Sequence, residues 1–118
     1  MKNLEELFFK NREELRQWLR KNHDKNPGIW IIFYKKHAQK QSIKHNDATE
    51  EAICFGWIDS IIKKMDSERY RIKFTPRKNT KNWSDVNKRS VLKLMEAKKM
   101  TEAGLEKIDD FLRTGKIP

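Results

Sequence analysis

The sequence predicts a single α+β domain over residues 1–118, in which helices pack on a mainly antiparallel sheet of three or four strands, in the order β-α-β-α-β-β-α-α. Three observations lead to this class. Residues 29–34 form an unbroken run of bulky side chains that is too short for a typical helix. Residues 69–74 alternate basic and apolar side chains, as a strand with one covered face does. Amphipathic segments with capping residues at their starts separate the strands, and the chain length suits one domain.

The first part of the chain predicts a strand, a helix and a second strand. Residues 4–10 favour a short edge strand, with an extra helical turn as the alternative because two glutamates weaken the strand pattern. Asn11, three residues before Glu14, is the expected N-cap of an amphipathic helix that a proline-glycine turn at 26–28 ends. Residues 29–36 lack polar alternation, which predicts a central strand covered on both faces.

A polar loop and a short helix come next. Residues 35–45 are polar and basic, which favours a loop. Asp47, three residues before Glu50, repeats the capping pattern and is the expected N-cap of a short buried helix. Gly56 can end this helix because glycine readily adopts the left-handed conformation that follows many helices.

A β-hairpin is predicted after Gly56. Residues 57–64 have the extended period, and residues 66–68 are typical of a turn. In residues 69–74 the basic side chains take every second position, so the hairpin carries a basic outer face. Pro76 ends the second strand, since proline lacks the amide proton that a sheet ladder needs.

Two consecutive helices are predicted to close the domain. Ser84 is a suitable N-cap for a helix that continues to Met100. Thr101 is a second cap, and the apolar spacing within 105–112 fits a helix seam. Residues 113–118 are expected to fray.

The charge balance points to anionic partners. The chain has 27 Lys and Arg against 17 Asp and Glu, a net charge of +10 and a pI near 9.8. Such a charge attracts nucleic acid, anionic lipid or phosphorylated ligands, although attraction alone gives no specificity.

Cysteine usage and the N-terminal residues indicate the compartment. A single cysteine excludes an internal disulfide, and His23, His37 and His45 have no spacing that suggests a metal site, so no metal or cofactor is expected. The first residues lack the apolar core of a signal peptide, and no apolar run is long enough for a membrane span. We therefore expect a soluble cytoplasmic protein.

Several segments that contain uncommon residues follow one another in a specific order. They are Glu51-Ala52-Ile53-Cys54-Phe55-Gly56-Trp57-Ile58-Asp59, Arg69-Tyr70, Phe74-Thr75-Pro76-Arg77, Asn82-Trp83-Ser84, Asn87 and Met100-Thr101-Glu102-Ala103-Gly104-Leu105. With these motifs the chain resembles the YdeI/OmpD-associated family, also called bacteriocin-protection proteins. The resemblance implies a small soluble bacterial domain linked to tolerance of bacteriocins or antimicrobial peptides, with no established reaction and no catalytic residues to assign. Many members of that family continue into a further helical segment.

A candidate ligand pocket is predicted where the two ends of the hairpin meet. Its residues are Trp57, Asp59, Arg71, Arg77, Trp83 and Asn87. A strand end that meets a helix start often offers free backbone amides to an anion. Each residue also has a structural interpretation. Asp59 could bond the Trp57 indole or pair with Arg71 or Arg77, Trp83 could pack as a hydrophobic staple, and Asn87 could close the cap at Ser84.

The basic hairpin face gives a second hypothesis, nucleic-acid binding. Its residues are Lys63, Lys64, Arg69, Arg71, Lys73, Lys78 and Lys81. Single-stranded bases would need exposed aromatic rings between these charges. The hairpin aromatics Tyr70 and Phe74 are in phase with Ile72 and are expected to be buried, so a solvated charged face is the favoured interpretation.

An enzyme acting on a small anionic substrate through Asp59 or Cys54 is the third hypothesis. Cys54 has no histidine close to it in the sequence, and a cysteine on the inner side of a helix is usually a small core residue. The sequence thus favours a non-enzymatic binding or stress-protection module for an anionic or peptide ligand.

Overall fold

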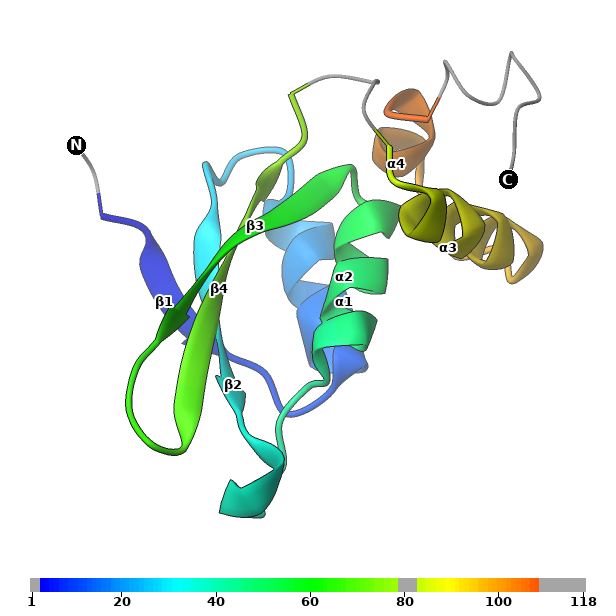
Figure 1. The fold of residues 1–118 in the computed structure, drawn as a ribbon. Helices are drawn as coiled ribbons and strands as arrows, with labels where there is room; N and C mark the ends of the chain where they lie inside the picture. The colour runs from blue at the N-terminus through cyan, green and yellow to red at the C-terminus, as the bar shows by residue number, and fades with distance from the viewer. Residues whose placement is uncertain (1–2, 79–82, 109–118) are drawn as a thin grey trace.

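The computed structural model describes residues 3–78 and 83–108, and Figure 1 shows a four-stranded sheet with helices beside it. The elements, in chain order, are β1 (Glu5–Phe8), α1 (Arg12–Asn22), β2 (Ile29–Tyr34), the 3-10 helix η1 (Lys36–Ala38), α2 (His45–Cys54), β3 (Trp57–Lys64), β4 (Arg69–Pro76), α3 (Asp85–Glu96) and α4 (Glu102–Glu106). The α+β class is confirmed, and the order of elements differs from the predicted one by η1, which lies inside the predicted loop.

The sheet is mixed rather than mainly antiparallel, which corrects the prediction. Its strand order is β1-β2-β4-β3, and β1 pairs with β2 in parallel while the other pairs are antiparallel. The reason is the connection between the first two strands. Helix α1 carries the chain back along the sheet, so β2 starts at the same end as β1 and runs in the same direction.

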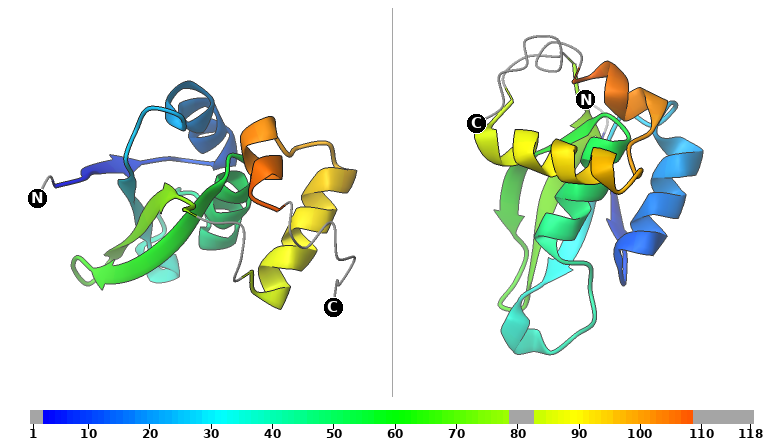
Figure 2. Two further views of the ribbon diagram at one scale, coloured as in Figure 1. Left: turned by 90° about the horizontal axis from the view of Figure 1, so that it is seen from above. Right: turned by 90° about the vertical axis from the view of Figure 1, so that its right-hand side faces the viewer.

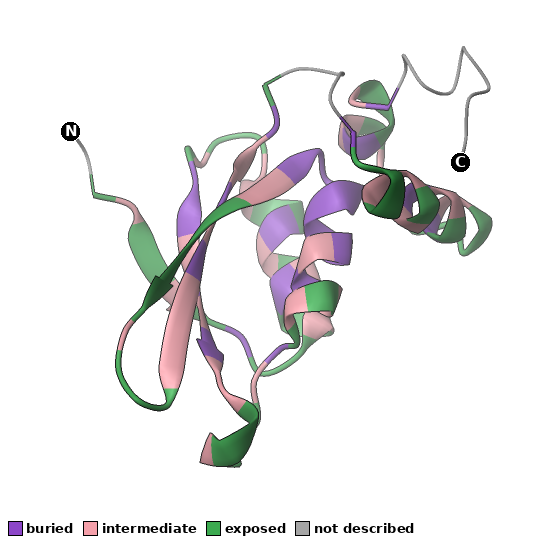
Figure 3. Cartoon of the chain, in the orientation of Figure 1, coloured by how far each residue is buried: buried purple, intermediate pink, exposed green. Residues whose placement is uncertain are grey.

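The helices lie on one side of the sheet. Helices α1 and α2 pack beside it, and α3 and α4 contact α2 farther from the strands, as both views in Figure 2 confirm. Buried residues concentrate where the strands and the first two helices meet (Figure 3). No helix among the described residues covers the opposite face of the sheet, which we call the open face.

Strand β2 is therefore covered on one face only, and the expectation of a strand buried on both faces is wrong. Ile29, Ile31 and Phe33 are at most 1% exposed and face the helices. Trp30 and Tyr34, which alternate with them, are partly exposed on the open face. The bulky run hid this difference because all six of its side chains are hydrophobic or aromatic.

Three of the four predicted helix caps are confirmed. The side chains of Asn11, Ser84 and Thr101 accept hydrogen bonds from backbone N–H groups in the first turns of α1, α3 and α4. The prediction for Asp47 is wrong, because α2 begins earlier, at His45, with Lys44 as a cap that makes no side-chain hydrogen bond. The Asp47 carboxylate instead pairs with a guanidinium of α1.

The predicted ends of the helices are confirmed only in part. Gly56 has a φ of +76°, as expected for the residue that follows α2. Helix α3 ends at Glu96, earlier than the predicted Met100. The last predicted helix corresponds to α4, and the rest of the 105–112 seam beyond residue 108, with the tail at 113–118, lies outside the described residues.

A buried ionic cluster joins α1, α2 and α3. Glu50 and Glu51 are 3% and 1% exposed, and their carboxylates receive the guanidinium groups of Arg12 and Arg16 and the ammonium of Lys93. Burial acts to raise the pKa of Glu50, but hydrogen bonds from Lys93 and Arg12 outweigh it and hold that pKa below its ordinary value. The cluster is thus a structural link between helices.

Candidate functional site

The open face carries aromatic rings on β1 and β2 and cations on the neighbouring strands β4 and β3. Its central residues are Glu6 and Phe8 in β1, Trp30, Ile32 and Tyr34 in β2, Arg69, Arg71 and Lys73 in β4, and Lys63 in β3. The pairing of neighbouring strands fixes their relative positions. Trp30 lies opposite Lys73 and Tyr34 lies opposite Arg69. Neighbouring strands are roughly 5 Å apart, so Trp30 and Tyr34 each have a cation as a cross-strand neighbour.

Trp30 is the centre of this array. The Arg71 guanidinium lies over its ring with the carbon Cζ 4.1 Å from the centroid, and the Lys63 ammonium is 5.7 Å away. Both distances are within the range of cation–π attraction, which is strongest for tryptophan. The flat guanidinium stacked on the indole extends the planar surface away from the sheet.

A carboxylate from β1 holds Arg71 in this position. Glu6 accepts a hydrogen bond from Arg71 Nη1, and the two side chains are 40% and 28% exposed. An exposed ion pair of this kind contributes little to stability, about 0–1 kcal/mol. Another anion that reaches the face can therefore replace Glu6 at a small cost.

The end of the open face nearest η1 has a pair of aromatic rings. Phe8, which is 41% exposed, meets the Tyr34 ring edge-on at 5.8 Å between centroids. Arg69 is beside them, and its guanidinium bonds Asp66 at 2.9 Å in the hairpin turn. The aromatic surface thus continues from Trp30 toward the loop after β2.

The two tryptophans of the predicted pocket are core residues. Trp57 is 1% exposed and donates its indole N–H to the carbonyl of His23 at 3.2 Å. Trp83 is 9% exposed and donates its indole N–H to the carbonyl of Lys107 at 3.0 Å. Each ring has found its polar partner in the backbone, as buried tryptophans usually do.

The other four predicted pocket residues are distributed over both sides of the sheet. Asp59 lies on the helix side, whereas Arg71 is on the open face. Arg77 is 6% exposed and stacks on Trp83 at 3.9 Å, and burial lowers the pKa of its guanidinium. Asn87 donates its backbone N–H to the Ser84 cap, which is the structural interpretation given for it. The structure brings Arg77 and Trp83 together and separates Arg71 from Asp59.

Asp59 has partners that the sequence did not predict. Its carboxylate accepts hydrogen bonds from the Thr49 hydroxyl at 3.2 Å and meets His45 Nε2 at 2.9 Å. The Trp57 indole, one of the partners considered for Asp59, donates its N–H to the backbone carbonyl of His23 instead. The separation of fourteen residues between His45 and Asp59 gave no local signal of this contact.

The predicted basic residues of the hairpin are also distributed over both faces of the sheet. Lys63, Arg69 and Lys73 belong to the open face, while Lys64, opposite Tyr70, has the helix-side register. Lys78 follows β4 and lines a hollow of about 360 Å³ together with Lys73 and Arg77. Lys81 lies outside the described residues.

Cys54 is fully buried. Burial is the largest influence on its thiol and raises its pKa, although a hydrogen bond with Arg16 acts in the opposite direction. A reactive cysteine needs an accessible thiolate. This position therefore fits the core interpretation.

Sequence reasoning missed the aromatic half of the open face, namely Phe8, Trp30 and Tyr34, and the carboxylate of Glu6. A weak signal was present in β2. The odd-numbered positions hold Ile29, Ile31 and Phe33, whose side chains contain no polar atom. The two residues whose rings carry a polar atom, Trp30 and Tyr34, are both at even-numbered positions. Such residues favour surfaces where one end is apolar and the other is wet.

Within residues 3–78 and 83–108, no group of three or more His, Cys, Asp or Glu side chains is arranged to hold a metal ion. Nor does any helix in this part of the chain have the length and apolar character required to cross a membrane.

One comparison with known proteins gave a match. A family model described as a domain of unknown function (DUF8412) matches residues 7–107, which is most of the chain. No curated protein and no solved structure matched the chain.

Proposed function

We propose that this chain, which belongs to the DUF8412 family of domains of unknown function, is a non-catalytic binding domain whose open face takes single-stranded nucleic acid. The observation that carries this proposal is the position of the Arg71 guanidinium over the Trp30 ring, 4.1 Å from its centroid, with Lys73 opposite Trp30 on β4 and Lys63 opposite Arg71 on β3. A single strand has both of the groups that this arrangement suits, flat bases and phosphate charges.

The open face favours an anionic ligand with flat rings over a peptide. Four cations, Lys63, Arg69, Arg71 and Lys73, lie beside the aromatic rings of β1 and β2, and flat groups of this kind stack on any base. A cationic antimicrobial peptide would be repelled by the same charges. Double-stranded nucleic acid hides its bases within the stack, so a sheet face of this kind would gain only phosphate contacts from it.

Binding would proceed by exchange of the partner of Arg71. A phosphate takes the place of the Glu6 carboxylate on the guanidinium, and a base stacks on the exposed side of the Arg71–Trp30 pair. A second base finds the Phe8–Tyr34 pair. The strand would therefore run across β2 and β1, with Lys63 and Lys73 holding its phosphates.

The test compares two replacements of Trp30 that differ in aromaticity. Fluorescence anisotropy with a labelled, unstructured oligothymidylate measures affinity at low salt. Trp30→Phe keeps a stacking ring and should bind nearly as the wild type does. Trp30→Ile keeps a bulky strand-forming residue without a ring, and it should bind about two- to fivefold more weakly, because Arg71 loses the cation–π contact that holds its guanidinium beneath the base.

Circular dichroism and thermal unfolding provide the folding control, because both replacements occupy a partly exposed position. Equal affinities of the two variants would contradict the proposal. So would a preference of the wild type for duplex over single strands.

The resemblance to bacteriocin-protection proteins extends the proposal to a stress role in the bacterial cytoplasm. If binding on the open face underlies that role, cells that express the Trp30→Ile variant should survive a bacteriocin less well than cells with the wild-type protein. If these cells survive as well as cells with the wild-type protein, protection does not depend on binding at the open face.

A further inference from the structure

A second hollow lies at the end of β2, below the open face. It has a volume of about 400 Å³ and is bounded by Lys35, Lys36, Lys40 and Lys44 from the connection between β2 and α2, together with Tyr34 and Ser42. The structure describes all nine of the residues that line it, and none of them is acidic. We call it the lysine pocket.

The charge of the lysine pocket is concentrated in a small space. Lysine ammonium groups around a concave surface reinforce one another, since the low-dielectric walls focus their field into the hollow. Two carboxylate residues, Asp66 and Glu68, line the adjoining hollow, which shares Tyr34 and Lys40 with the lysine pocket, and the Asp66 carboxylate is paired with Arg69. A ligand that fits the lysine pocket must therefore bring more than one negative charge.

The connection that presents these lysines is held by hydrogen bonds. Ile43 is 3% exposed and donates its N–H to the Phe9 carbonyl at 3.0 Å, and the Lys35 N–H donates to the Glu68 carbonyl at 2.8 Å. The Ser42 hydroxyl accepts from the Tyr34 N–H at 3.3 Å and keeps its own proton to donate. The pocket is thus built before any ligand arrives, which reduces the entropy cost of binding.

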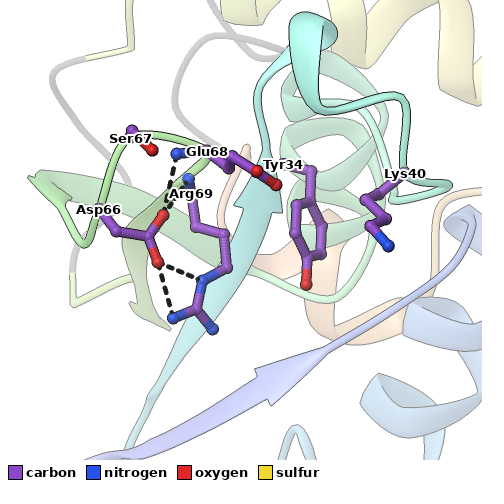
Figure 4. A pocket seen from close by; sticks show the side chains of 6 residues that line it. All are labelled: Tyr34, Lys40, Asp66, Ser67, Glu68 and Arg69. Carbon is purple, nitrogen blue, oxygen red and sulfur yellow. Dashed lines mark hydrogen bonds and ion pairs between the residues drawn. The ribbon is translucent and has the colours of Figure 1, made fainter.

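The lysine pocket meets the open face at Tyr34 and extends to the helix side, where His45 and Tyr70 line it. Tyr34 belongs to the aromatic pair with Phe8 and also lines the pocket. Figure 4 shows the adjoining hollow, where Tyr34 and Lys40 form one side and Arg69 the other. A strand that crosses the open face toward η1 would bring its end to the lysine pocket.

We infer that the lysine pocket binds a phosphate monoester, the dianionic form that a terminal phosphate has and an internal phosphodiester lacks. Four ammonium groups and one hydroxyl are suitable donors for its three terminal oxygens. The source that best suits the geometry is the phosphorylated end of the strand on the open face, and this assignment of source rests on the proposed function. A free phosphorylated compound has the same chemistry.

The first experiment compares oligothymidylates of one length with a 5′-phosphate, with a 3′-phosphate or with hydroxyl ends. At least one phosphorylated form should bind about tenfold more tightly than the hydroxyl form, the gain expected from a new charge-assisted contact. The double variant Lys36→Ser and Lys40→Ser should lose this advantage and keep the affinity for the hydroxyl form. Both lysines are exposed, so the fold should tolerate the change.

A charge-matched control removes two lysines from the helical layer. Lys21 in α1 and Lys99 after α3 are exposed and lie outside the pocket lining. The variant Lys21→Ser and Lys99→Ser should keep the advantage of the phosphorylated strand. The Trp30→Ile variant should weaken both strands equally and keep their ratio.

The second experiment titrates inorganic phosphate into the labelled protein and follows backbone amide signals by NMR. Saturable shifts at Ser42 and Lys36, absent in the lysine double variant, support the pocket. If they occur without any advantage of a phosphorylated strand, the pocket holds and its source is a free phosphate compound, even where Trp30 proves irrelevant to strand binding. If neither inorganic phosphate nor a terminal phosphate acts at the pocket, the inference is overturned.

Discussion

At the scale of single residues, the Glu6 carboxylate and the proposed phosphate ligand compete for the guanidinium of Arg71. Glu6 from the neighbouring part of the sheet occupies its guanidinium now, and the same guanidinium covers the Trp30 ring. An internal carboxylate on a binding cation competes with the ligand, so it lowers affinity and maintains the position of the cation until the ligand arrives. This balance can be measured by neutralising Glu6 alone.

Replacement of Glu6 by Gln should increase the affinity for an oligothymidylate about two- to fivefold, the range that corresponds to the loss of one exposed ion pair. The matched control is Glu5→Gln. Glu5 is the preceding residue of β1 and has the opposite register, so this variant makes the same change in net charge away from the open face. Titration by anisotropy at constant salt measures both. An equal effect of the two replacements would mean that only net charge matters.

At the scale of elements, the sequence predicted the strands and helices well and their faces poorly. The caps at Asn11 and Ser84 are local signals, because side chain and backbone partner are three residues apart. The coverage of β2 depends on whether helices lie on one side of the sheet or on both, and that is decided by the path of the whole chain. A run of bulky residues is compatible with either arrangement.

The prediction of the candidate site was incomplete for the same reason, because the sequence does not show which face of the sheet the helices cover. The basic half of the open face was predicted from the alternation in β4, since that pattern is complete within one strand. Its aromatic half comes from Phe8 and Trp30, on strands far away in the sequence. The predicted pocket separated for a related reason, because Asp59 and Arg71 have opposite registers across the hairpin. Period alone gives the alternation but does not say which face is covered.

The ionic cluster between helices predicts how stability depends on pH. Hydrogen bonds from Lys93 and Arg12 hold the folded-state pKa of Glu50 below its ordinary value of 4.5 despite the opposing effect of burial. The ionised carboxylate therefore contributes stability above pH 4.5, and this contribution is lost as the pH falls through the folded-state pKa.

Glu50→Gln should lower the free energy of unfolding at neutral pH by about 1–3 kcal/mol, because a neutral amide replaces the buried carboxylate that accepts hydrogen bonds from Arg12 and Lys93. It should also reduce the loss of stability on acidification. Urea unfolding at several pH values measures both effects, with the exposed Glu106→Gln as the control. A variant with the stability and acid sensitivity of the wild type would show that the cluster contributes nothing.

At the scale of the whole molecule, a net charge of +10 is distributed over both layers, yet the proposal assigns binding to one of them. Salt dependence separates local from diffuse attraction. Each phosphate neutralised on a single strand contributes about −0.7 to the slope of log affinity against log salt. Four cations on the open face predict a slope of about −3.

Removal of Lys63 and Lys73 together, each as a serine, should reduce the magnitude of this slope by about half. The control is the pair Lys21 and Lys99 in the helical layer, which has the same formal charge change and should leave the slope near that of the wild type. Anisotropy titrations at four salt concentrations provide the slopes. If both double variants change the slope equally, attraction is a property of the total charge and the open face has no special role.

The most direct test of the open face uses the indole N–H signals of the tryptophans in the NMR spectrum. Trp57 and Trp83 donate these protons to backbone carbonyls inside the core, so their signals serve as internal references. The Trp30→Phe variant identifies the Trp30 signal by its absence. On titration with an unstructured oligothymidylate, the Trp30 signal should shift and saturate while those of Trp57 and Trp83 stay in place. Saturation of binding with an unmoved Trp30 signal would contradict the account.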